Sequence, residues 1–143
     1  MLFIRLKRAL VSLAAVGICL AVVLGVYVMN ACKLRMLSGE RTFYLDSSSS
    51  QGLRKESISL IDLPRVRGES VRFSCQEDEV LSIIHACGGK VEFVEEVCGI
   101  TSYYCTTGEW ESGILLNGKK INLHIAFSNG QCVVGVPIIF DGF

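Results

Sequence analysis

The fold is decided by a stretch of alternating apolar residues that contains two Asn-Gly pairs: LLNGKKINLHIAFSNGQCVVGVP, residues 115–137. Asn-Gly between alternating apolar runs is the strongest short-range signal for a β-hairpin, because both central residues of a type I′ turn need a positive φ. Asn117-Gly118 and Asn129-Gly130 therefore predict two tight turns. They belong to a predicted meander of antiparallel strands that runs from Lys90 to Phe140.

Both turns predict the same register for the strand between them. Counting outward from Asn117-Gly118 places Ile114 opposite Ile121 and Trp110 opposite Ile125. Counting from the second turn places Ile125 opposite Val134. A slip by one residue would turn every side chain to the other face, so the register is well specified. The central strand is predicted over Lys119–Phe127, and its apolar face carries Ile121, Leu123, Ile125 and Phe127.

The first hairpin and the last strand of the meander are predicted from one dipeptide and one proline. Cys98-Gly99 predicts a third hairpin, which places Cys105 opposite Glu92 and away from the core. Pro137 falls opposite Asn122, at a position that should donate a ladder hydrogen bond. Because proline has no N–H to donate, the last strand is predicted to be an edge strand, with its pairing either bulged near Gly135 or ended there.

A short helix is predicted before the meander. Ser74 and Glu77 have the spacing of a capping box, and the apolar residues that follow recur at helical spacing. Gly88-Gly89 ends this helix, and strands are predicted before it at Ser57–Leu63 and Glu69–Phe73. The predicted fold class is α+β: an N-terminal transmembrane helix, then strand, helix and antiparallel meander, with the helix over the apolar face.

An uncharged apolar segment precedes this domain. Ala9–Met29 has twenty-one residues without a charge, and Arg5, Lys7 and Arg8 precede it. Roughly 20 apolar residues span a bilayer, whereas the core of a cleavable signal has about 7 to 15. The length therefore favours an uncleaved membrane anchor. A cleavage site that ends at Ala31 would put a methionine where a small residue belongs.

Three segments are predicted along the chain. They are a membrane anchor or uncleaved signal over residues 1–32, a tether with a Ser-rich loop over 33–56, and an α+β domain over 57–143. The basic residues before the span predict an N-terminus inside the cell and a domain outside the cytoplasm. Lys33 and Arg35 follow the span and oppose that orientation.

The charge of the chain beyond the anchor argues against a nucleic-acid partner. Residues 33–143 contain eleven Lys and Arg and fourteen Asp and Glu, a net charge of about −3, whereas a nucleic-acid surface should be basic. The five cysteines of the domain cannot all pair within one chain, and we interpret them as small buried hydrophobic residues. The chain has no Cys-x-x-Cys, no His-x-x-x-His and no Gly-rich phosphate loop, so neither a metal nor a cofactor is predicted.

Three motifs resemble a known family. VCGITSYY (97–104), NGKKINLHIA (117–126) and VPII (136–139) resemble the YwmB-like proteins of Firmicutes, over roughly Gly68 to the end. The resemblance implies a fold like one lobe of the TATA-box-binding protein, and an extracytoplasmic protein with an envelope- or sporulation-related role. It transfers no functional residue to this chain. The chain departs from the family pattern by its short length and by the lack of a predicted helix after the last strand.

Four residues are predicted to form a candidate binding surface on the open face of the sheet. The register places His124 directly opposite Glu111, within cross-strand reach. This pair indicates either a general base or pH-responsive pair, or an ordinary cross-strand charge pair. No catalytic residue is assigned. The predicted surface comprises Tyr103, Glu111, Asn122 and His124.

The leading hypothesis is a non-enzymatic, membrane-anchored domain that binds a protein or envelope partner through its open face or a sheet edge. The alternative is an envelope enzyme that uses His124 and Glu111. A third hypothesis, a nucleic-acid-binding module, requires the opposite topology. A homodimer is also considered, through a sheet edge or through the small-residue stripe Gly17, Ala21 and Gly25, although glycine and alanine are common in membrane helices.

Overall fold

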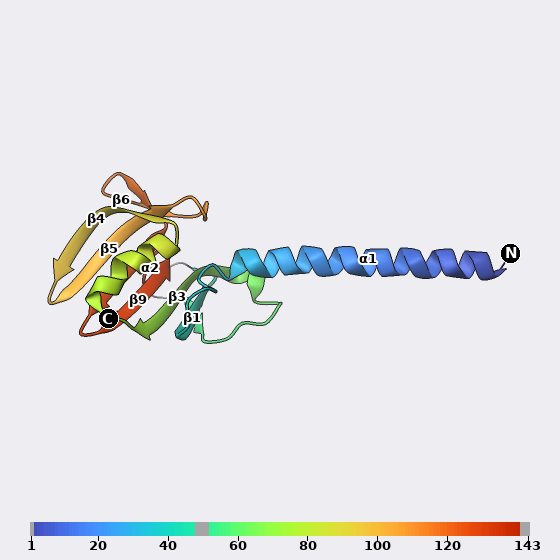
Figure 1. Cartoon of the computed structure of the whole chain (residues 1–143), viewed down its shortest axis with the longest axis horizontal. Coiled ribbons are helices and arrows are strands. Elements are labelled where there is room, and N and C mark those ends of the chain that lie inside the picture. Colours follow the sequence, from blue (N-terminus) through green and yellow to red (C-terminus); the bar gives the residue numbers. More distant parts are fainter. Residues whose placement is uncertain (1, 48–51, 141–143) are drawn as a thin grey trace. The chain divides into compact units, whose positions relative to one another are not determined.

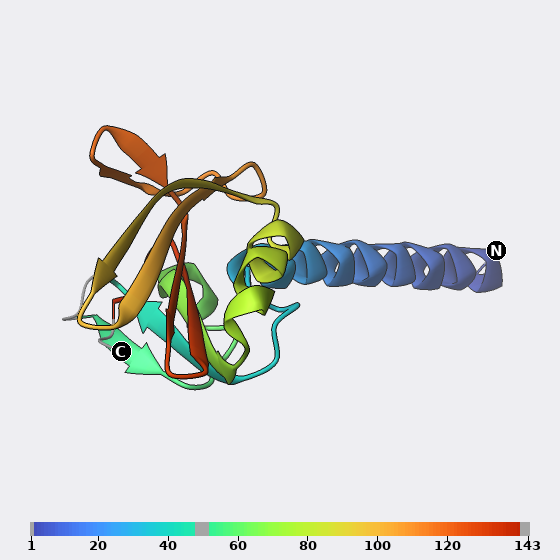
Figure 2. The same cartoon turned by 60° about the vertical axis from the view of Figure 1, so that its left-hand side comes forward.

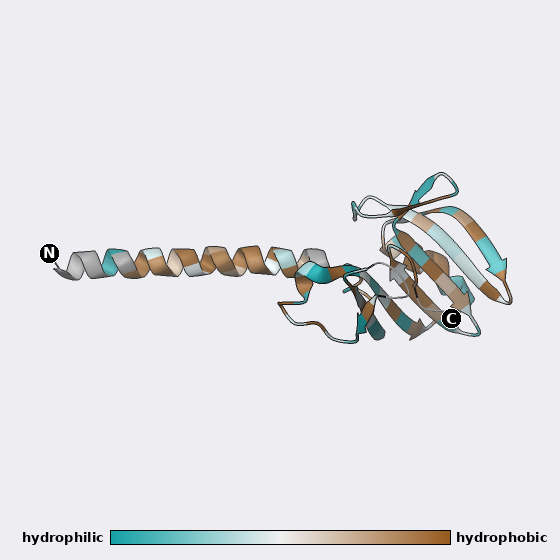
Figure 3. Cartoon of the chain, turned by 180° about the vertical axis from the view of Figure 1, so that it is seen from behind, coloured by the Kyte–Doolittle hydropathy of each residue, from teal (hydrophilic) through white to brown (hydrophobic). Residues whose placement is uncertain are grey.

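The chain forms two compact units, residues 1–32 and 33–143. The computed structural model describes residues 2–47 and 52–140, so most of the predicted Ser-rich loop lies outside the described residues. The first unit is helix α1, Leu2–Ala31. Its stretch Leu10–Met29 is long and apolar enough to cross a membrane, and hydrophobic residues dominate it (Figure 3). The predicted N-terminal apolar helix is confirmed.

The second unit is built on one antiparallel sheet of seven strands (Figure 1), which confirms the α+β class. Helix α2, Val80–Ala86, follows a 3₁₀ turn at Glu77–Glu79, and a second 3₁₀ turn covers Leu63–Arg65. The order of the strands across the sheet is β2-β1-β3-β9-β8-β5-β4. These strands are β1 Glu40–Leu45, β2 Leu53–Lys55, β3 Val66–Ser74, β4 Gly89–Val97, β5 Ile100–Thr107, β8 Leu123–Ser128 and β9 Gln131–Val136.

The three predicted turns are all present. Asn117-Gly118 joins β6, Ile114–Leu116, to β7, Lys119–Ile121, with Ile114 opposite Ile121. Asn129-Gly130 joins β8 to β9, and the residues of both Asn-Gly pairs have positive φ, as type I′ turns require. Cys98-Gly99 likewise joins β4 to β5. Turns are local features, so a few residues are enough to specify them.

The predicted central strand over Lys119–Phe127 is wrong, because the chain leaves the ladder at Asn122. Residues before it pair with β6 in a separate two-stranded hairpin (orange in Figure 2), whereas residues after it form β8. Strand β8 pairs with β5, so Ile125 lies opposite Tyr103 and not opposite Trp110. The backbone N–H of Asn122 donates to the carbonyl of Cys105 (3.2 Å) at the break.

The last strand is not an edge, which corrects the prediction made from Pro137. Strand β9 lies between β3 and β8, with Val134 opposite both Val71 and Ile125. It ends at Val136, so the proline follows the ladder and removes no hydrogen bond from it.

The segment before the predicted domain also belongs to the sheet. Strands β1 and β2 lie within residues 33–56 and extend the sheet beyond β3. The predicted strand at Ser57–Leu63 is wrong, because this segment forms a turn that the Asp62 side chain stabilises. The Asp62 carboxylate accepts hydrogen bonds from the Ser59 backbone N–H (3.0 Å) and from Lys55 Nζ (2.8 Å).

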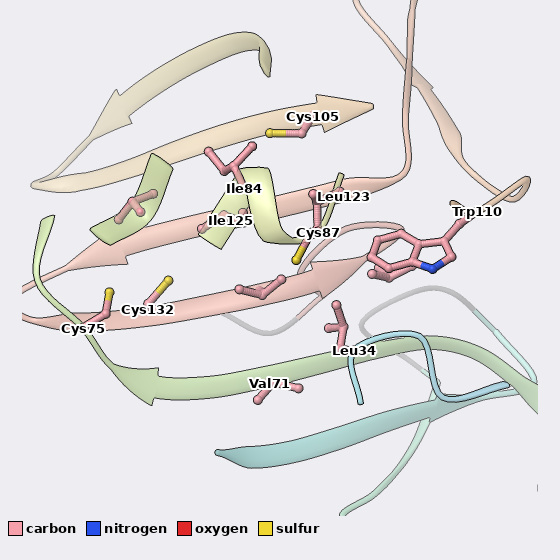
Figure 4. Packing of buried hydrophobic residues seen from close by; sticks show 13 residues of the cluster. Leu34, Val71, Cys75, Ile84, Cys87, Cys105, Trp110, Leu123, Ile125 and Cys132 are labelled. Atoms are coloured by element: carbon pink, nitrogen blue, oxygen red, sulfur yellow. The ribbon is translucent and has the colours of Figure 1, made fainter. Parts of the chain in front are cut away.

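Helix α2 packs against one side of the sheet, here called the helix face (Figure 4). The capping box lies two residues later than predicted, at Gln76 and Glu79. The prediction that Cys105 faces away from the core is also wrong. A register shift between Val91 and Phe93 places Cys105 opposite Val91, on the helix face. The buried core includes Val71, Val80, Ile84, Cys87, Cys105, Trp110, Leu123, Ile125, Cys132 and Val134.

A buried carboxylate links the segment that follows α1 to this core. Leu34 is fully buried, and its backbone N–H donates to Glu69 Oε2 (3.1 Å). Glu69, which is only 1% exposed, forms an ion pair with Arg41 (3.0 Å). Arg41 in turn donates to the carbonyls of Leu34 (3.1 Å) and Leu37 (2.9 Å). Residues 34–37 are therefore held by both members of one ion pair, here called the Glu69–Arg41 clamp.

We expect Glu69→Ala to lower the free energy of unfolding by roughly 2 to 4 kcal/mol, because it leaves the Arg41 charge and the Leu34 N–H without their acceptor. Urea unfolding of the full chain in detergent micelles, followed by the fluorescence of Trp110, the one tryptophan, measures the change. The control is Glu40→Ala, at an exposed position one residue before Arg41, which we expect to change stability by less than about 0.5 kcal/mol. Equal losses in both variants would contradict a specific role for the clamp.

Candidate functional site

Three aromatic rings form a row on the face of the sheet opposite α2, here called the second face. Phe93 of β4 stacks on Tyr104 of β5, with ring centroids 4.5 Å apart and planes at 19°. Tyr104 stacks on His124 of β8 at 4.4 Å and 11°. Because Tyr104 lies directly opposite both Phe93 and His124 in the ladder, the row follows from the strand register.

The chain after β9 covers part of the second face. The backbone N–H of Ile139 donates to His124 Nδ1 (3.2 Å). The Phe140 ring meets the Tyr44 ring edge to face at 5.1 Å. A Cβ on Gly135 would lie 2.7 Å from the Ile139 nitrogen, so the close approach of this segment depends on glycine at that position. The second face is therefore closed over His124, whereas the sequence predicted an open face.

His124 is a buried, neutral imidazole. It is 8% exposed, and burial lowers its pKa from 6.5 to about 4. Since Nδ1 accepts the Ile139 N–H, the proton of the neutral ring must be on Nε2. Nε2 has no hydrogen-bond partner among the described residues. A general base needs access to solvent or substrate, and neither ring nitrogen has it in this arrangement.

The predicted pairing of His124 with Glu111 is wrong. His124 lies opposite Tyr104 on one side and Gly135 on the other. Glu111 lies in the connection between β5 and β6, where its backbone carbonyl accepts a hydrogen bond from Lys120 Nζ. The register prediction failed because it continued the Asn117-Gly118 hairpin beyond the observed Ile114–Ile121 pair and placed Trp110 opposite Ile125 of β8. The separate β6–β7 hairpin ends at that pair, so β5 pairs with β8 instead.

Asn122 is buried, and its side chain forms hydrogen bonds with the backbone. It is 1% exposed, and its Oδ1 accepts the backbone N–H of Thr107 (2.7 Å). Its Nδ2 donates to the carbonyls of Thr107 (2.8 Å) and Trp110 (2.7 Å). The side chain thus satisfies the backbone where β5 ends, which explains why the chain leaves the ladder at this residue.

Tyr103 lies on the helix face, not on the second face. It is opposite Ile125 and packs, partly buried, against the core. Its neighbour Tyr104 has the position that the sequence analysis gave to Tyr103. The pKa of Tyr104 is raised, mainly by burial and to a smaller extent by the nearby Glu95 carboxylate. Tyr104 and Phe93 were missed because the register of β5 against β8 is set by a long connection and not by a turn.

The buried thiols give no sign of nucleophilic chemistry. Burial raises the pKa of Cys75, Cys87 and Cys132, and it raises that of Cys105 to about 12. The nucleophile is the thiolate, so groups held in the thiol form are unreactive at neutral pH. Within residues 2–47 and 52–140, no three His, Cys, Asp or Glu side chains lie close enough together to hold a metal ion.

No protein-family model, curated protein or solved structure matches the chain. The geometry of the chain is therefore the basis for the function proposed below.

We expect Asn122→Ala to destabilise the domain by roughly 2 to 4 kcal/mol, because it leaves one N–H and two carbonyls buried without partners. Asn122→Asp should also destabilise, since a carboxylate cannot donate to the carbonyls of Thr107 and Trp110. Urea unfolding measures both changes, and Ser112→Ala, at an exposed position, is the control. A near-neutral Asn122→Ala would show that the connection after β5 does not need this side chain.

We expect the stability of the domain to fall between about pH 6.5 and pH 4 because of His124. Folding favours the neutral ring, so its contribution is complete above the unfolded pKa of 6.5 and is lost as the pH falls toward about 4. The contribution of His124 to the free energy of unfolding above pH 6.5 is about 3 kcal/mol. His124→Gln should remove this part of the pH profile of unfolding.

His85→Gln is the matched control, because His85 is the other histidine of the chain and is exposed on α2. Burial raises the pKa of Glu69, so Glu69 changes the stability with pH in the direction opposite to His124. This contribution is present in the unsubstituted chain and in both variants, so it cancels when their profiles are compared. Identical profiles for His124→Gln and the unsubstituted chain would show that His124 does not cause this loss of stability.

Proposed function

We propose that this chain is a non-enzymatic, single-pass membrane protein that presents its α+β domain outside the cytoplasm and binds a protein or envelope partner there. The observation that carries the proposal is α1. Its stretch Leu10–Met29 has no charge and is long and apolar enough to cross a membrane. An isolated helix of this length gains stability from burial in a bilayer, where its backbone groups are already satisfied internally.

The orientation rests on the flanking charges. Arg5, Lys7 and Arg8 precede the span, and basic residues concentrate on the cytoplasmic side of membrane helices. Lys33 and Arg35 follow the span and reduce the asymmetry. The three basic residues before the span still outnumber the two that follow it, which favours the outside position of the domain.

The environment of the candidate residues supports binding over catalysis. His124 is closed off by the chain after β9, and Glu111 is not its neighbour in the ladder. The sheet still offers exposed apolar groups to a partner. Val94 and Val97 on β4 are 48% and 64% exposed. An edge strand of this kind is a common docking site for another polypeptide.

The resemblance to YwmB-like proteins adds a biological setting to this proposal. The order of strand β3, helix α2 and the meander β4 to β9 is the order that the resemblance implies for one lobe of the TATA-box-binding protein. On that basis we propose an envelope- or sporulation-related role in a Firmicutes bacterium. The net negative charge of residues 33–143 opposes binding to DNA.

A tag placed after Phe143 tests the orientation. We expect external protease to remove the tag from intact cells, because the domain lies outside the membrane. Lysed cells show whether the protease can reach the tag at all. A tag that is protected in intact cells and removed after lysis would place the domain in the cytosol and overturn the proposal.

A further inference from the structure

Strand β4 is an open edge of the seven-stranded sheet. It lies last in the order of strands, and among the strands that the structure describes it pairs with β5 alone. Val97 and Ile100 form the closing pair of the two-residue turn at Cys98-Gly99. Hydrogen-bonded pairs alternate along an antiparallel ladder, so the backbone N–H and C=O groups of Val94 and Glu96 point away from β5. These groups can pair with a further strand.

The side chains along this edge follow the order apolar, apolar, acidic, acidic. The register shift of β4 ends at Phe93, so Phe93, Val94, Glu95 and Glu96 alternate regularly between the two faces of the sheet. Val94 lies opposite Tyr103 on the helix face, and Glu96 shares that face. Phe93 and Glu95 lie on the second face. Phe93 is partly exposed and the other three are exposed, so an added strand would meet all four side chains.

Phe93 is the outermost ring of the aromatic row. One face of its ring stacks on Tyr104 at 4.5 Å, and Tyr104 stacks in turn on His124. The three rings follow the strand order β4, β5, β8, so the other face of the Phe93 ring points toward the side on which β4 has no neighbouring strand. An aromatic residue opposite Phe93 in an added strand would continue the row, and aromatic cross-strand pairs stabilise a sheet.

No cation of the domain compensates the two glutamates of this edge. Glu92, before the regular part of β4, forms ion pairs with Lys90 (3.8 Å) and Lys119 (3.1 Å). In the part of the chain that the structure describes, no lysine or arginine forms an ion pair with Glu95 or Glu96. Two basic residues in an added strand would compensate both charges, whereas acidic residues would be repelled.

A second copy of this chain does not supply such a strand. A two-fold contact of β4 with β4 would bring four glutamates into one short contact. The opposite edge strand, β2, covers three residues, and its Lys55 already forms an ion pair with Asp62 (2.8 Å). The charge and the order of side chains on β4 therefore favour a segment of another protein.

We propose that the β4 edge binds an extended segment of a partner protein, which adds to the sheet as an antiparallel strand and reads basic, basic, apolar, aromatic from its N-terminus. The two basic residues lie opposite Glu96 and Glu95, and the apolar and aromatic residues follow opposite Val94 and Phe93. The direction is antiparallel because every neighbouring pair in the sheet is antiparallel and such pairs are the more stable. This inference rests on the binding role proposed above and names the class of partner.

Disulfide tethering at Cys98 tests the order of the side chains. Cys98 is exposed and directly follows β4, at the end where the N-terminus of the added strand would lie. The probe is a synthetic peptide with capped ends and the sequence CGGKRVYT, whose cysteine exchanges with Cys98 of the full chain in detergent micelles and excess 2-mercaptoethanol. Pairing of the peptide with β4 raises the equilibrium fraction of mixed disulfide. Peptide mapping by mass spectrometry counts the mixed disulfide at Cys98 alone.

We expect the mixed disulfide with CGGKRVYT to be about threefold to tenfold more stable than that with CGGYVRKT, which has the same composition in the reverse order. Glu95→Lys with Glu96→Lys should remove this advantage, because basic residues would then face basic residues. Glu56→Lys is the matched control. It makes the same change of charge at an exposed position next to the opposite edge strand, and it should leave the advantage unchanged.

Val94→Pro tests whether the peptide adds as a strand. Proline lacks the N–H that would donate to the peptide, and an edge strand accepts proline where the N–H faces solvent. We expect Val94→Pro to reduce the stability of the CGGKRVYT mixed disulfide by about threefold or more, whereas Val94→Thr keeps the N–H and should retain it. Trp110 fluorescence during urea unfolding shows that each variant remains folded.

Four results would overturn the proposal. Equal stability of the two mixed disulfides would show that β4 does not read the order of the side chains. An equal loss in Glu56→Lys would indicate general attraction between charges, and an unchanged value in folded Val94→Pro would exclude strand pairing. Copurification of two differently tagged chains that is lost in Glu95→Lys with Glu96→Lys would identify a second copy as the occupant.

The tethering experiment is independent of the orientation in the membrane, because it uses the purified chain. A tag protected in intact cells would therefore refute the outside position of the domain and leave the strand site intact. An accessible tag together with equal stability of the two mixed disulfides would refute the strand site alone.

Discussion

The Glu69–Arg41 clamp is the interaction that fixes the start of the domain against its sheet. It holds residues 34–37, which precede β1, in the core, and Leu34 is buried there. Burial of a carboxylate is costly unless it is paired and hydrogen-bonded, and Glu69 has both kinds of partner. Four residues, 30–33, lie between Met29, the last residue of the apolar span, and Leu34.

A second constraint, the buried amide of Asn122, shapes the rest of the sheet. By satisfying the backbone of Thr107 and Trp110, it ends one hairpin and begins β8 at the same point. Strand β8 can then pair with β5, and this pairing brings Tyr104 against His124. The aromatic row is therefore a consequence of where the amide interrupts the ladder. A continuous strand would have put a different residue opposite His124.

The difference between local and long-range pairing explains what the sequence could predict. The turns at Asn117-Gly118 and Asn129-Gly130 were predictable, because positive φ is a property of the turn residues themselves. The insertion of β9 beside β3 was not, since it depends on contacts between distant parts of the chain. Among the candidate site residues, His124 was assigned to the correct face. Its cross-strand neighbour was predicted wrongly, because no turn or other local feature of the sequence determines the register of β5 against β8.

Closure of both faces changes which surface of the sheet can serve as an interaction site. Helix α2 and residues 34–37 cover the helix face, and the chain after β9 covers the second face over His124. A sheet that is covered in this way can meet a partner mainly through its edges. Native proteins usually protect long edges with charges or bulges, and β4 has both, with a register shift near Glu92 and two glutamates beyond it. The same glutamates that repel a second β4 would attract a basic strand, so protection against unwanted pairing and selection of a partner can reside in the same two side chains.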